Sequence, residues 1–116
     1  MKHIRTEDRV IEDKNVTIVT FADKKLFNSS QIEQLGEELF GLTSNKRNIV
    51  LDFSNLDYVS SVAFGKFIIL YRMLRESRNK LVFCCVAPEI LDVIRIMRLD
   101  KFIKCASDVK IALASI

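Results

Sequence analysis

The chain contains few of the residues from which small proteins build catalytic or cofactor sites. Its 116 residues include one histidine, three cysteines, three glycines, one proline and no tryptophan. Neither of the glycine-rich patterns G-x-x-x-x-G-K-[ST] and G-x-G-x-x-G occurs, so the usual phosphate-binding loops are missing. The low proline and glycine content also excludes collagen-like and flexible-linker architectures.

The residues with catalytic or metal-binding potential are scattered. A catalytic serine or cysteine needs a base held in position, and His3 lies in a segment that we expect to be a frayed surface end. Cys84 and Cys85 adjoin in a predicted strand, so we expect their side chains on opposite faces, as buried structural thiols. Cys105 should lie nearer the surface, and Asp52 should cap a loop. The sequence therefore predicts no enzyme, metal or cofactor.

Long hydrophobic runs and concentrated charge are also absent. The longest apolar run, Phe67–Tyr71, is far shorter than the ~20 residues that cross a bilayer. The first residues are polar and mixed in charge, which excludes a secretory signal. Eighteen basic and fifteen acidic residues give 18 − 15 = +3, without the basic stripe typical of nucleic-acid binding. We therefore expect a cytoplasmic protein with no membrane insertion and no nucleic-acid partner.

The remaining composition is that of a globular protein. Apolar residues make up 49% of the chain and charged residues 28%, which is sufficient for a hydrophobic core without disulfides. No linker and no internal repeat divides the sequence, so residues 1–116 are predicted to form a single domain.

Hydrophobic periodicity predicts strands that alternate with helices. Apolar and β-branched runs indicate strands at residues 9–11, 16–21, 48–53, 80–86 and 102–104. Apolar spacings of three and four, behind capping residues, indicate helices that start near residues 28–30, 60–61, 88 and 107–108. This order is typical of an α/β fold: a mostly parallel four- to five-stranded sheet, antiparallel at its N-terminal strand, packed with about four helices.

The predicted second helix has an unusual outer side. Its core side carries Ala63, Phe64, Phe67, Leu70, Tyr71 and Leu74, and its outer side carries Val62, Gly65, Lys66, Ile69, Arg72, Met73 and Glu76. Three of the outer residues are apolar, which indicates a partner surface unless another helix or a loop covers them. Ser60 or Ser61 should be the N-cap, and Ser61 should project, exposed, at the edge of the outer side.

Five short motifs together resemble the STAS domain, the module of anti-sigma factor antagonists and of sulfate-transporter tails. Members of that family have a strand ending L-D, then D-S-S-G-L-G, K-L-V-L, P-E and L-D-K-L-F. The corresponding segments of this chain are Leu51–Asp52, Ser60–Gly65 (S-S-V-A-F-G), Lys80–Phe83, Pro88–Glu89 and Leu99–Ile103. The resemblance extends over nearly the whole chain in the same order.

The resemblance implies a phosphoacceptor. In the family it is the first serine after the aspartate, which corresponds to Ser61, with Ser60 as the alternative. Here Ser60 replaces the aspartate, Val62 the second serine and Ala63 the first glycine, whereas Gly65 retains the second glycine. The pattern Ser-Ser-x-Ala-x-Gly-Lys is similar to that of a less-studied branch of the family.

The resemblance also implies a partner-binding surface. It would include the loop before the first helix, in which Asn28 stands where many members have aspartate. The residues assigned to this surface are Asn28, Ser29, Asp57, Ser60, Val62, Gly65, Lys66, Ile69 and Met73.

The function that the resemblance implies is a switch between partners. The unmodified protein would bind an anti-sigma factor that is also a serine kinase, and a phosphatase would reset the serine after phosphorylation. The alternative is a non-phosphorylated STAS scaffold or accessory subunit, for instance in lipid transport, that binds its partner constitutively. We expect the chain to be complete from Met1 and not a transporter tail. An enzyme or small-ligand binder on this fold is disfavoured by the missing residue types, and the oligomeric state is left open.

Overall fold

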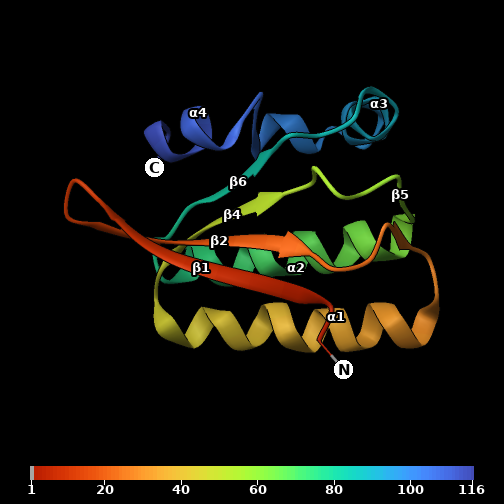
Figure 1. Cartoon of the computed structure of the whole chain (residues 1–116), viewed down its shortest axis with the longest axis horizontal. Helices are drawn as coiled ribbons and strands as arrows, with labels where there is room; N and C mark the ends of the chain where they lie inside the picture. The colour runs from red at the N-terminus through yellow and green to blue at the C-terminus, as the bar shows by residue number, and fades with distance from the viewer. Residues whose placement is uncertain (1) are drawn as a thin grey trace.

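The sheet has five strands and follows the predicted topology. The computed structural model describes residues 2–116. Strands β1 (Ile4–Ile11) and β2 (Lys14–Phe21) form an antiparallel hairpin. Strands β4 (Asn48–Asp52), β6 (Leu81–Cys84) and β7 (Lys104–Ala106) extend the sheet in parallel, in the order β1-β2-β4-β6-β7 (Figure 1). The α/β class and the antiparallel first strand are thereby confirmed.

Four helices pack on this sheet. Helices α1 (Ser29–Gly41) and α2 (Ser61–Glu76) lie along one face, and α4 (Val109–Ala114) lies on the other (Figure 1). Helix α3 (Pro88–Ile96) contributes its buried residues to the core on the α1–α2 side. Two single-turn helices, η1 (Leu42–Asn45) and η2 (Leu99–Lys101), precede β4 and β7.

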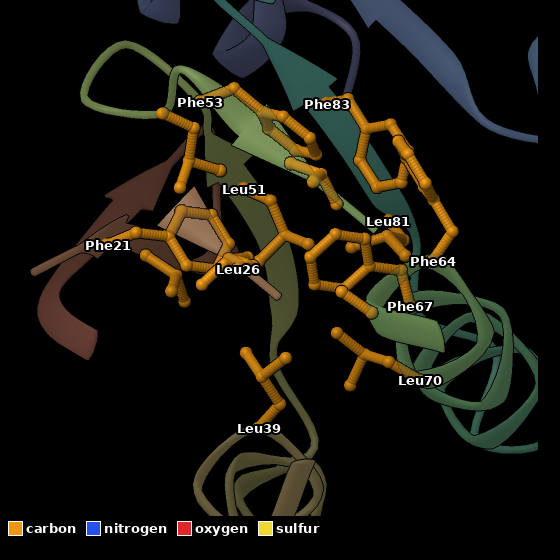
Figure 2. Close-up of a cluster of buried hydrophobic side chains, with 14 of the residues drawn as sticks. Phe21, Leu26, Leu39, Leu51, Phe53, Phe64, Phe67, Leu70, Leu81 and Phe83 are labelled. Atoms are coloured by element: carbon orange, nitrogen blue, oxygen red, sulfur yellow. The ribbon is translucent and has the colours of Figure 1, made fainter. Parts of the chain in front are cut away.

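The two faces of the sheet bury different side chains, because successive strand residues point to opposite sides. On the α1–α2 side, phenylalanines from the ends of neighbouring strands meet those of α2 (Figure 2). The ring of Phe53 lies 5.7 Å from that of Phe67 and 4.9 Å from that of Phe83. The α4 side is filled by aliphatic side chains and one buried cysteine, with no aromatic ring among the described residues of that cluster. The aromatic cluster therefore anchors α2, the helix that carries the candidate phosphoacceptor.

Several predicted boundaries were wrong. Strand β1 begins at Ile4, not at residue 9, because its ladder with β2 continues to the pair Ile4–Phe21. The last strand begins at Lys104 and not at residue 102, since Phe102 still closes the turn of η2. Strand β3 (Lys25–Leu26), which pairs in parallel with β5 (Tyr58–Val59), was not predicted.

The expectation of a frayed, surface His3 was also wrong. Its side chain is buried, with Nδ1 2.7 Å from Asp23 Oδ2 and Nε2 2.9 Å from Gln34 Oε1. The carboxylate of Glu38 accepts from the His3 backbone N–H at 2.8 Å. Hydrogen bonds to Gln34 and Asp23 raise the pKa of His3 against the opposing effect of its burial. These contacts hold His3 in a fixed position immediately before β1.

The expected orientation of the adjacent cysteines was wrong as well. Strand β6 ends at Cys84, and Cys85 has a left-handed backbone with φ of 59°. This turn brings the two sulfur atoms to 3.5 Å from each other. Cys84 is buried as predicted, and Cys105 is partly exposed as expected. Cys85 was also predicted to be buried but is partly exposed, because the turn carries it beyond the end of the strand.

Candidate partner-binding site

Helices α1 and α2 begin side by side at one end of the molecule (Figure 1). The short β3–β5 ladder places them there, because each of its strands leads within a few residues into one of the two helices. The ladder continues as a hydrogen bond from the backbone N–H of Ser60 to the carbonyl oxygen of Leu26, at 2.9 Å. The loop before α1 and the start of α2 thus form one surface.

Both helices have side-chain caps. Asn28 Oδ1 accepts from the N–H groups of Ser30 at 2.9 Å and Gln31 at 3.3 Å, and Gln31 Oε1 accepts from the Asn28 N–H at 3.2 Å. At α2, Ser60 Oγ accepts from the Ala63 N–H at 3.2 Å. Of the two serines, Ser60 is therefore the N-cap. Ser61 is the first helical residue, and its side chain is exposed as predicted.

The electrostatic environment of Ser61 favours negative charge. Unpaired N–H groups and the helix dipole make the N-terminus of each helix electropositive. The first turns of α1 and α2 contain no acidic residue. Asp57 is exposed in the preceding loop, where its backbone N–H donates to the Lys24 carbonyl oxygen at 2.7 Å. An anionic group on Ser61 would consequently be stabilised by the free protein.

Exposed apolar side chains lie at this end of the molecule and farther along α2. Phe27 is 62% exposed, Tyr58 51%, Val62 60% and Ile69 42%. Phe27 and Tyr58 line a shallow hollow. We call Phe27, Tyr58, Ser61, Val62 and Ile69 the serine face. The two aromatic residues were missed in the sequence, although aromatic side chains in otherwise polar loop segments were a usable signal.

The other residues assigned to partner binding occupy varied positions. Ser29 is exposed at the first position of α1, and Met73 is half-buried farther along α2. Gly65 has open space around the position of a Cβ atom, within the part of the chain that the structure describes. Lys66 differs, because its side chain is only 18% exposed and its Nζ lies 2.9 Å from Glu33 Oε1 on α1. Lys66 therefore joins the two helices.

The comparison with known families identifies the fold. The sequence matches the model of the STAS domain over residues 9–112. This chain belongs to the STAS domain family. The expected membership of the STAS domain family is thus confirmed.

Individual relatives support this assignment. A Bordetella bronchiseptica protein named as a candidate anti-sigma factor antagonist, BtrV, is 34% identical over 70 residues, which are 60% of this STAS chain and 60% of BtrV. An anti-sigma-factor antagonist (STAS) domain protein from Planctomyces limnophilus superimposes with a TM-score of 0.84 at 17% identity, over 99% of this chain and 98% of that one. Phosphorylated SpoIIAA from Bacillus superimposes with a TM-score of 0.68 at 12% identity, over 96% and 98%. Both structures share the fold of this STAS domain.

The names of the relatives indicate one class of protein. This STAS domain resembles proteins that are named as anti-sigma factor antagonists. Within residues 2–116, no helix combines the length and the hydrophobicity needed to cross a bilayer.

Proposed function

We propose that this STAS domain is a partner switch whose serine face binds an anti-sigma factor and whose Ser61 is phosphorylated to release it. The observation that carries the proposal is that two adjacent serines have different structural roles. Ser60 caps α2, and Ser61 is exposed next to apolar side chains of the serine face. A kinase could therefore modify Ser61 without removing the cap of the helix.

The switch would operate by local electrostatics. A phosphoryl group adds a charge of about −1.5 to −2. In the free protein the N-terminus of α2 stabilises this charge. Against the apolar surface of a partner the phosphate must be desolvated, and a penalty of about 3–4 kcal/mol would weaken binding several hundredfold. No large conformational change is required.

The chemistry needs two further proteins. A kinase, which in this proposal is the anti-sigma factor itself, holds ATP and accepts the proton of the Ser61 hydroxyl. The oxygen of Ser61 then bonds to the γ-phosphorus as ADP leaves. A phosphatase hydrolyses the ester with water and restores the serine. The STAS domain contributes only the acceptor and the binding surface.

The decisive experiment is the intact mass of the protein isolated from its own organism, followed by fragment mapping. We expect a species heavier by one phosphoryl group, with the group on Ser61. The Ser61→Ala variant should lack this species, and the matched Ser60→Ala variant should retain it. Phosphate on another residue, or an unmodified protein in every growth condition, would contradict the proposal.

A second candidate is a scaffold that binds its partner constitutively. It is favoured by Ser60, which stands where the family motif has aspartate, so that a carboxylate that usually accompanies the acceptor is missing. The Ser61→Asp variant distinguishes the two candidates. A switch predicts weaker partner binding with little loss of stability, whereas a constitutive scaffold predicts unchanged affinity.

A further inference from the structure

Two potential metal ligands lie side by side at the carboxyl ends of β4 and β6. Asp52 and Cys84 are paired in the register of these parallel strands, so their side chains point to the same face of the sheet. Cys84 is fully buried and Asp52 is half-buried. Asp52 Oδ1 accepts from the Ser54 N–H at 2.9 Å, which fixes the orientation of the carboxylate. Sites in α/β proteins commonly lie at this end of the strands.

The backbone of Cys85 adds a third ligand. A left-handed conformation is uncommon for residues other than glycine, asparagine and aspartate, and it costs about 1 kcal/mol or more. Here φ of 59° turns the Cys85 side chain back, so that its sulfhydryl donates to Cys84 Sγ at 3.5 Å. One ligand atom from each of Asp52, Cys84 and Cys85 lies within 4.8 Å of the other two. In a regular strand the side chains of Cys84 and Cys85 would point to opposite faces of the sheet. The left-handed turn instead brings their sulfur atoms together.

We propose that Asp52, Cys84 and Cys85 form a binding site for a thiophilic divalent cation such as Zn²⁺. With Zn–S bonds of about 2.3 Å, two sulfurs of a tetrahedral site are separated by about 3.8 Å. The observed 3.5 Å is close to this separation, so the sulfurs need little movement. Two thiolates and one carboxylate are ligands typical of zinc, and they do not suit Mg²⁺ or Ca²⁺.

Burial and nearby carboxylates act on both thiols. Burial raises the pKa of the Cys84 and Cys85 thiols, and the carboxylates of Asp52 and Asp108 add to this effect. A cation that binds the two sulfurs as thiolates would release their protons. Cys84 belongs to the buried cluster on the α4 side, whereas Cys85 is partly exposed and provides the access.

The test is a titration of the full chain with Co²⁺, which replaces Zn²⁺ and reports thiolate coordination by absorption. The protein is kept reduced with a phosphine, which contributes no competing thiol. We expect one equivalent of Co²⁺ to produce a near-ultraviolet thiolate-to-cobalt band that Zn²⁺ then abolishes. The Cys85→Ser variant should lose this band, and its Co²⁺ affinity should fall by more than the about 10–100-fold typical of a lost outer-shell partner.

Two further variants test whether Asp52 is a ligand and whether the band is specific to the proposed site. Asp52→Asn should weaken Co²⁺ binding while retaining the thiolate band, and Cys105→Ser should leave both unchanged. Far-ultraviolet circular dichroism of each variant reports whether it is folded. The partly exposed Cys85 is mutated instead of the buried Cys84, because its replacement disturbs the core less. No thiolate band in the wild type, or a band that is lost in Cys105→Ser and retained in Cys85→Ser, would overturn the proposal.

Discussion

The inner and outer sides of α2 both carry apolar side chains, but these lie in opposite environments. Phe64, Phe67 and Leu70 on the inner side are fully buried, whereas Val62 and Ile69 on the outer side are 60% and 42% exposed. The inner residues stabilise the domain. The outer residues do little for the fold within the described chain, and exposed apolar side chains of this kind indicate a partner. Stability and binding should therefore be separable along one helix.

The largest effect on stability is expected from Phe67→Ala. The Phe67 ring lies within 6.0 Å of the rings of Phe21, Phe53, Phe64 and Phe83, so its removal leaves a cavity that the cluster cannot close. We expect a loss of about 3–5 kcal/mol in the free energy of unfolding, measured by urea denaturation. A loss below about 1 kcal/mol would mean that the inner side of α2 does not anchor the helix.

On the outer side, Ile69→Glu should act on binding alone. A charge placed in an apolar interface should cost about 2 kcal/mol or more, which is about thirtyfold in the dissociation constant. The free energy of unfolding should change by no more than about 0.5 kcal/mol. The measurements are calorimetric titration with the anti-sigma factor and urea denaturation.

The same substitution elsewhere provides the control. Ile96 on α3 is 80% exposed, and Ile96→Glu should leave the affinity unchanged. Unfolding of Ile69→Glu would show that the outer side belongs to the core. Equal losses of affinity in both variants would show that binding depends on overall charge and not on the serine face.

Much of this architecture followed from local sequence patterns. The apolar period of α2 predicted both its buried and its exposed side, and β-branched runs predicted the central strands. The cap at Ser60 was one of two readings of a capping sequence. These features depend on neighbouring residues, and the periodicity of the sequence records them directly.

The features that were missed depend on contacts between distant residues. Phe27 and Tyr58 belong to one surface only because two-residue strands pair across more than thirty positions of sequence. His3 is buried because Asp23 and Gln34 fold against it. Cys85 faces Cys84 because of one backbone angle. Neither hydrophobic period nor residue type encodes these arrangements.

A smaller effect is expected at the start of α2. The Ser60→Ala variant loses the hydrogen bond to the Ala63 N–H, and we expect it to lower the free energy of unfolding by about 1 kcal/mol. The adjacent Ser61→Ala variant removes an exposed hydroxyl and should change stability by less than about 0.5 kcal/mol. The stabilities of the two variants are compared by thermal unfolding. The reverse order of stability would show that Ser61 caps the helix, and Ser60 would then be the exposed acceptor.

The sharpest test of the outer side is Gly65→Ala, which should stabilise the free protein slightly. Apart from its chain neighbours and the backbone of its own helix, no described atom lies within 4 Å of the added Cβ, so the methyl group fits the free protein. Alanine should increase the free energy of unfolding by up to about 1 kcal/mol, because glycine is a poor helix former. Gly41 on α1 has equally open surroundings, and Gly41→Ala should leave partner affinity unchanged. If the partner packs closely on the serine face, Gly65→Ala alone will bind more weakly although it is more stable. Equal affinity of both variants would place the contact away from this part of α2.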